Sequence, residues 1–185
     1  MRSSRLVLAA LAALPLAVNA QSMTVLTSGG DARACSLAAE LSETLAPSRS
    51  DLDPCNRALE EVHLSRRDRA ATFVNRGILQ ARLDRFQDAL NDYNAALEIN
   101  DELPQAWNGK GNLYYLAERY DDAIAAYERA LELNLPPRQV AYYNLGLVYE
   151  KLGDEAAAER SYSMALELMP EWEAAKFRLE RLKQN

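Results

Sequence analysis

The sequence predicts an all-α protein built as a solenoid of helix–turn–helix units. The first reason is a repeat, since Gly77, Gly111 and Gly146 stand 34 and 35 residues apart. The second is the spacing of three and four between apolar residues inside each stretch, which is the period of a helix. Three further sets keep the same phase: Ala89, Ala123 and Ala158; Tyr93, Tyr127 and Tyr162; and Ala96, Ala130 and Ala165.

This pattern resembles the tetratricopeptide repeat, a helix–turn–helix unit of 34 residues. The stretch from Trp107 to Ala130 carries it most fully, and an aromatic residue precedes each repeat glycine by four positions. The resemblance covers about residues 70–172 and implies a right-handed solenoid with repeats at 69–103, 104–138 and 139–170. The small glycine and alanine side chains are expected where the two helices of a unit cross closely.

The N-terminus is expected to be an export signal. Residues 1–20 combine two arginines, an apolar run from Leu6 to Val18 and small residues before a cut after Ala20. Residues 21–30 are expected to be a flexible leader ending in Ser28-Gly29-Gly30. The chain is therefore expected to be exported, to the periplasm of a Gram-negative bacterium by preference and otherwise by secretion.

Residues 31–68 are expected to form a degenerate helical hairpin stapled by a disulfide. Cys35 and Cys55 are 20 residues apart, the same distance that separates Phe73 from Tyr93. In the repeat those positions face each other, and export favours pairing of two cysteines. Asp51 stands where the repeats have Ala89, Ala123 and Ala158, so the second helix is expected to start after it. A redox or nucleophilic role is the other reading of the cysteines, but no C-x-x-C motif occurs.

Residues 171–185 are expected to form a capping helix, because a solenoid needs a polar outer surface at its ends. Its candidate apolar contacts are Ala174, Phe177, Leu179 and Leu182.

Composition excludes several classes of function. The 185 residues include 21 Lys+Arg and 27 Asp+Glu, for a formal net charge of −6, which argues against a nucleic-acid binder. Two cysteines and the single histidine, His63, are too few for a Cys/His zinc site. No phosphate-binding loop or nucleophile motif occurs. The sequence therefore predicts no enzyme activity, no catalytic residue, no metal and no cofactor.

The resemblance implies that function resides in a concave groove lined by the first helix of each repeat. Asparagines in this groove are suited to pairing with a peptide main chain, because each offers a donor and an acceptor. Aromatic and aliphatic side chains beside them suit anchoring. The ten expected groove residues are Val74, Asn75, Ile78, Asn108, Asn112, Tyr115, Leu116, Tyr143, Asn144 and Leu147.

The groove residues argue against one known ligand of the family and are compatible with two functions. Some family members hold a C-terminal carboxylate with Lys, Arg and Asn; Val74 and Ile78 stand where polar groups are needed, so that ligand is not expected. The favoured function is a protein–protein interaction adaptor of the cell envelope that binds a peptide segment or helix. The alternative is a scaffold subunit that associates with itself or a larger assembly. It remains open that these side chains pack only against neighbouring repeats.

Overall fold

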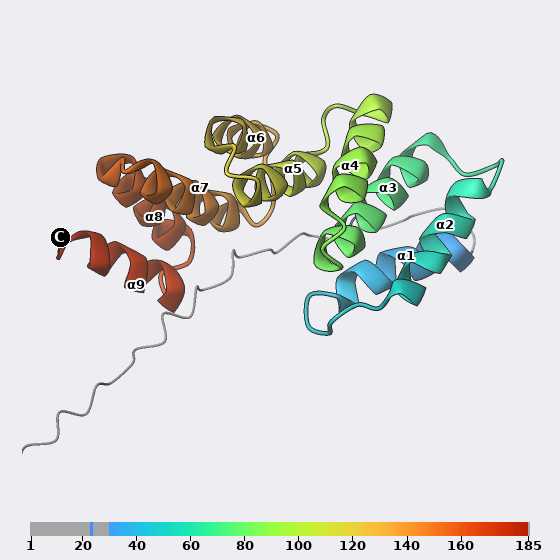
Figure 1. The fold of residues 1–185 in the computed structure, drawn as a ribbon, viewed down its shortest axis with the longest axis horizontal. Helices are drawn as coiled ribbons and strands as arrows, with labels where there is room; N and C mark the ends of the chain where they lie inside the picture. Colours follow the sequence, from blue (N-terminus) through green and yellow to red (C-terminus); the bar gives the residue numbers. More distant parts are fainter. Residues whose placement is uncertain (1–22, 24–29, 185) are drawn as a thin grey trace, which may run out of the picture.

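The structure is a computed structural model that describes residue 23 and residues 30–184. The expected signal peptide and, apart from Met23 and Gly30, the expected leader lie outside the described residues. The described part is helical, as the sequence predicts, and contains no strand (Figure 1). Its elements are α1 (Gly30–Leu41), η1 (Arg49–Leu52), α2 (Asp53–Glu60), α3 (Arg66–Arg82), α4 (Phe86–Ile99), α5 (Pro104–Leu116), α6 (Tyr120–Glu132), α7 (Arg138–Leu152), α8 (Glu155–Leu168) and α9 (Glu173–Leu182).

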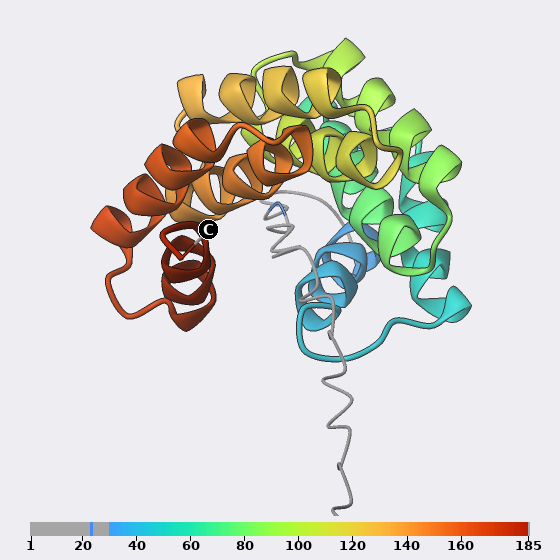
Figure 2. The same ribbon diagram turned by 60° about the vertical axis from the view of Figure 1, so that its left-hand side comes forward.

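The helices form a two-layered arch (Figure 2). Helices α3, α5 and α7 make the inner layer, and α4, α6 and α8 make the outer layer. The hairpin of α1 and α2 closes one end of the arch, and α9 closes the other. We call the side of α3, α5 and α7 that is turned toward the open side of the arch the inner face.

The same turn joins the two helices of each repeat. Its central residue has a positive φ in all three copies: 59° at Asp84, 57° at Glu118 and 75° at Gly153. The next residue's N–H donates to a carbonyl five positions earlier, as from Arg85 to Gln80 at 2.9 Å. This is the Schellman arrangement that ends a helix with one left-handed residue. Only the third copy has glycine there, so the other two turns bear the steric cost of a Cβ.

Each repeat glycine packs against the tyrosine 16 residues later. A Cβ on Gly77 would lie 2.8 Å from the Tyr93 ring, and one on Gly111 would lie 2.6 Å from the Tyr127 ring. Both tyrosines are fully buried, with at most 1% of each side chain exposed. The recurring glycines therefore mark the places where a helix backbone rests directly on an aromatic ring.

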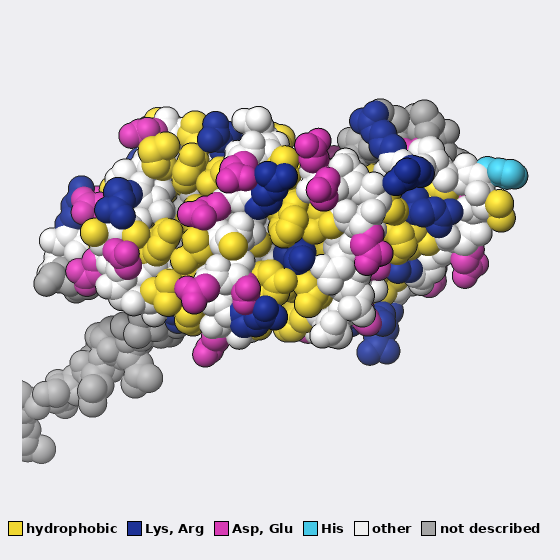
Figure 3. Space-filling view, turned by 90° about the horizontal axis from the view of Figure 1, so that it is seen from above, with side chains coloured by type: hydrophobic (Ala, Val, Ile, Leu, Met, Phe, Trp, Pro, Cys, Tyr) yellow, Lys and Arg dark blue, Asp and Glu magenta, His cyan; other side chains and the backbone are white. Residues whose placement is uncertain are grey.

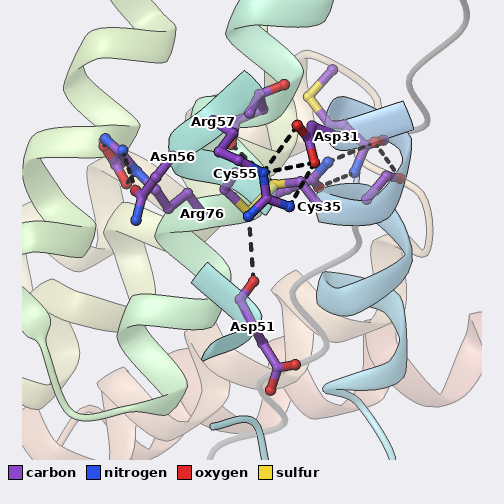
Figure 4. The surroundings of a disulfide bond; sticks show 12 residues. Asp31, Cys35, Asp51, Cys55, Asn56, Arg57 and Arg76 are labelled. Carbon is purple, nitrogen blue, oxygen red and sulfur yellow. Dashed lines mark hydrogen bonds and ion pairs between the residues drawn. A yellow bond between two sulfur atoms is a disulfide. The ribbon is translucent and has the colours of Figure 1, made fainter. Parts of the chain in front are cut away.

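The N-terminal hairpin is stapled as the sequence predicts (Figure 4). Cys35 on α1 and Cys55 on α2 form a disulfide with Cα atoms 4.7 Å apart, and both residues are fully buried. The Arg57 guanidinium pairs with Asp31 at 2.7 Å, and this hydrogen bond holds the pKa of Asp31 below its usual value. Asp51 lies in η1, before α2 begins, and its carboxylate accepts a hydrogen bond from the Ser48 N–H at 2.6 Å.

Arg76 ties this hairpin to the first repeat. Its Nε and Nη2 atoms donate to the two carboxylate oxygens of Asp92 on α4 at 2.8 and 2.7 Å. Its Nη1 atom donates to Asn56 on α2 at 2.8 Å. Arg76 stands where the family often has leucine; here its fixed fork of donors links three helices.

Helix α9 packs on the last repeat through a smaller apolar face than the sequence predicts. Ala175 is fully buried, and Ala174, Leu179 and Leu182 pack against the same cluster. Phe177, expected among these contacts, is 54% exposed, because it lies two residues from Ala175 and so on another side of the helix.

In the part of the chain that the structure describes, no helix is both long and apolar enough to cross a membrane. Figure 3 shows acidic, basic and apolar side chains interspersed over much of one face, with several Lys and Arg side chains gathered at the end that carries the histidine. The lone histidine, His63, is exposed.

Candidate peptide-binding face

All ten expected groove residues lie on the inner-layer helices, but the structure does not leave them equally open. The elements that close the ends of the arch cover part of the inner face. Four apolar residues expected to line a groove are 3% exposed or less: Val74, Ile78, Tyr143 and Leu147. These four side chains pack inside the protein in this structure and do not line an open surface.

At the N-terminal end, α3 packs against α1. Val74 and Ile78 belong to the buried cluster that contains both disulfide cysteines. Asn75 lies between them in sequence, is fully buried, and forms two hydrogen bonds with the main chain of Met23. The N-terminal part of the inner face is therefore covered by other residues of the same chain.

At the C-terminal end, α9 lies against α7. The Tyr143 ring stacks against Trp172 just before α9, with centroids 4.7 Å apart, and Leu147 packs in the same cluster. Glu150 on α7 accepts hydrogen bonds from Arg178 and Arg181 on α9 at 3.0 and 2.8 Å. These contacts hold α9 over the last part of the inner face.

Glu150 belongs to this contact, although it is not among the residues that the repeat pattern predicts. The sequence does place two basic residues together, because Arg178 and Arg181 are three residues apart and so share one side of the capping helix. Their common partner on another helix was not readable from spacing along the chain.

The central helix α5 is the more open part. Leu116 is 48% exposed, and Tyr115 is half-buried beside Tyr120, with ring centroids 6.0 Å apart. Burial raises the pKa of Tyr115, and neighbouring Tyr120 adds to the effect. Tyr115 therefore presents a neutral phenol at neutral pH, suited to hydrogen bonding and apolar contact.

Asparagines form a buried polar row beside these residues. Asn112 Oδ1 accepts from the Tyr127 hydroxyl at 2.7 Å and from Asn144 Nδ2 at 3.1 Å. Burial raises the pKa of Tyr127 well above its usual value, so its hydroxyl keeps the proton that it donates. The structure thus brings together two of the four expected asparagines, Asn112 and Asn144, from neighbouring repeats.

Three amide atoms of this row have no hydrogen-bond partner among the described residues: Asn108 Oδ1, Asn112 Nδ2 and Asn144 Oδ1. All three residues are at most 4% exposed. An unpaired buried polar atom costs roughly 1–3 kcal/mol. Two acceptors and one donor therefore remain unpaired beneath the surface of the inner face, where a ligand reaches them only after the side chains that cover them move aside.

Comparison with known proteins agrees with this architecture. The family model described as tetratricopeptide repeat matches residues 104–134 and 140–171. No curated protein sequence matches the chain closely enough to be compared with it.

Solved structures show the same fold. YrrB, described as a TPR protein with an unusual peptide-binding site, is 27% identical, with a TM-score of 0.61 over 69% of this chain. The chain spans 63% of the length of YrrB. PilF of Pseudomonas aeruginosa is 23% identical, with a TM-score of 0.66, over 83% of this chain and 69% of its own.

The first TPR of Spaghetti (RPAP3), solved bound to an HSP90 peptide, is 19% identical, with a TM-score of 0.60, over 67% of this chain and 97% of its own. The chain described here therefore carries tetratricopeptide repeats, matched over residues 104–134 and 140–171, within a helical solenoid of tetratricopeptide-repeat fold.

Proposed function

We propose that this chain is a non-enzymatic adaptor of the cell envelope that binds an extended segment of a partner protein along its inner face. The observation that carries the proposal is the open end of α5, where exposed Leu116 and half-buried Tyr115 lie beside the unpaired amide atoms of Asn108, Asn112 and Asn144. Once the covering side chains move aside, a partner's main chain supplies both the N–H and the C=O groups that these amides lack, whatever the partner's side chains are.

The residues beside the row supply apolar contact. Leu116 and Tyr115 lie on α5, at the end of the helix that carries Asn108 and Asn112. An aromatic anchor next to a row of main-chain hydrogen bonds is a common way to bind a peptide with modest sequence preference. The peptide-binding site named for YrrB and the peptide bound to the Spaghetti (RPAP3) domain support a peptide ligand for this fold.

The proposed location in the envelope rests on two features. Residues 1–20 have the three-part plan of an export signal. The buried Cys35–Cys55 disulfide suits an oxidising compartment such as the periplasm.

In-cell photo-crosslinking tests this function. A photoreactive amino acid replaces Tyr115 on the inner layer, and the same amino acid replaces exposed Asp122 on the outer layer as the matched control. Adducts are then identified by mass spectrometry. We expect a discrete foreign protein to be trapped from position 115 and not from position 122. The same adducts from both positions, or none from position 115, would contradict the proposal.

A self-associating scaffold is the second candidate, because large apolar side chains are exposed at the C-terminal end. Phe177 is 54% exposed, Leu168 49% and Met169 43%. Such side chains at one end of a solenoid suit end-to-end association. Adducts from position 115 only to a second copy of the chain, together with a molar mass that rises with concentration, would favour this candidate over the adaptor.

A further inference from the structure

Met23 is bound by its main chain to a residue 52 positions later. Its N–H donates to Asn75 Oδ1 at 2.7 Å, and its carbonyl oxygen accepts from Asn75 Nδ2 at 2.9 Å. The Ser36 hydroxyl on α1 donates to the same carbonyl at 3.0 Å. One side chain thus pairs with both the N–H and the C=O of Met23, and the Ser36 hydroxyl supplies a second hydrogen bond to the carbonyl oxygen.

This pairing is needed as much by Asn75 as by Met23. Asn75 is fully buried, and the two bonds to Met23 are its only side-chain hydrogen bonds among the described residues. Loss of Met23 would leave a buried amide with an unmet donor and an unmet acceptor. The Met23 side chain also packs, partly buried, against the apolar clusters that include Val74 and Ala71 on α3.

Asn75 with Ser36 therefore forms a binding site for one residue of an extended peptide, read through its N–H and C=O. We propose that Met23 is a built-in occupant of this site, and that a partner's extended segment takes the N-terminal end of the inner face only by displacing it. This inference rests on the proposed function for the displacing partner, but not for the site itself.

The competition is strongly biased toward the chain's own segment. Met23 belongs to the same chain as its site and closely precedes α1 in sequence, and a group on a short linker acts at an effective concentration of about 1 mM. A free peptide must exceed that level or bind more tightly. The site then opens only to a partner that also gains contacts further along the inner face, at α5.

The first test measures hydrogen exchange of the Met23 amide by NMR in the purified chain. We expect exchange to be slowed at least about tenfold relative to an unstructured amide, as the buried hydrogen bond to Asn75 requires. In an Asn75→Ala variant the protection is expected to disappear. The matched control is Asn91→Ala, an exposed asparagine on α4 of the same repeat. An unprotected Met23 amide in the unmodified chain would overturn the inference.

The second test uses a fluorescent synthetic peptide with the sequence of residues 21–29. The chain receiving it carries Met23→Pro, which removes the N–H that Asn75 accepts, or Met23→Leu, which keeps it. We expect the peptide to bind the Met23→Pro chain at least about tenfold more tightly, because its site is vacated. A peptide N-methylated at its methionine is expected not to bind. Equal affinity of both chains, or binding of the methylated peptide, would overturn the inference.

These tests involve no foreign protein, so their outcome is separate from that of the proposed function. A protected Met23 amide with no foreign adduct at position 115 leaves the built-in occupant standing and removes the adaptor. A foreign adduct at position 115 together with an unprotected Met23 amide supports the adaptor and overturns the built-in occupant. Thermal melting checks that the Asn75→Ala variant is folded. As a second variant, Ser36→Ala removes only the hydrogen bond from the Ser36 hydroxyl to the Met23 carbonyl, and we expect an intermediate loss of protection of the Met23 amide.

Discussion

A Cβ on Gly111 would lie 2.6 Å from the ring of Tyr127, closer than any relaxed carbon–carbon contact. We therefore expect Gly111→Ala to lower the free energy of unfolding by about 1–3 kcal/mol, since the buried ring has no room to move away. Urea denaturation measures the effect. The hydroxyl of the same ring donates to Asn112, so displacement of the ring also disturbs the asparagine row.

Gly30→Ala is the matched control, because a Cβ at Gly30 has no neighbour within 4 Å. Alanine favours helix more than glycine does, so this variant is expected to be neutral or slightly stabilising. A Gly111→Ala chain as stable as the original would show that the contact with Tyr127 is not tight in solution.

At the turn residue Glu118, introducing a glycine is expected to stabilise the protein. Glu118 has φ 57°, and the equivalent position of the third repeat is Gly153 at 75°. We expect Glu118→Gly to raise the free energy of unfolding by up to about 1 kcal/mol, because glycine adopts this conformation without a Cβ penalty. Gly153→Ala should lower it by a similar amount; nothing lies within 4 Å of that Cβ, so the loss reports backbone conformation alone. A decrease with Glu118→Gly would contradict the account.

The Cys35–Cys55 disulfide is expected to stabilise the hairpin of α1 and α2. Replacing both cysteines by alanine should cost about 2–4 kcal/mol, since the unfolded hairpin regains chain entropy. In a solenoid the loss is local, so hydrogen exchange should speed up in α1 and α2 before α7 and α8. Uniform acceleration along the whole chain would show that the hairpin is not a separate unit of stability.

Glu150 is expected to control the docking of α9. It is 11% exposed and binds two arginines of α9, so Glu150→Gln should destabilise the cap by roughly 1–3 kcal/mol. Hydrogen exchange in α9 measures the opening. Glu132→Gln, which removes an exposed pair with Arg129, is the control and should change little. Unchanged protection of α9 after Glu150→Gln would mean that its apolar face alone holds it.

Much of the fold was predictable because the same local contacts occur in all three repeats. Gly111 and Tyr127 recur in phase because the same helix crossing recurs, and turns at Asp84, Glu118 and Gly153 recur for the same reason. The disulfide followed from this phase too, since Cys35 and Cys55 keep the spacing of facing residues.

The burial of the groove residues was not predictable from the same phase. Tyr143 packs against Trp172, and Val74 lies in a cluster with Cys35. Both contacts involve the segments at the two ends of the arch, which occur once in the chain, so the repeat pattern does not predict them. The hydrogen bonds of Met23 to Asn75 span 52 residues and depend on main-chain atoms, which every residue carries and no sequence pattern marks.

Asn108 offers the most direct test of main-chain binding on the inner face. Its Oδ1 atom is unpaired, and its side chain forms no hydrogen bond that the described fold would lose, so Asn108→Ala should leave stability unchanged or slightly raised. The measurement is the yield of partner adduct from a photoreactive residue at position 115, with Asn91→Ala on α4 as the control. We predict a fall of about fivefold or more with Asn108→Ala, as loss of one buried hydrogen bond implies, and none with Asn91→Ala. An undiminished yield with Asn108→Ala would contradict recognition of a partner's main chain by this face.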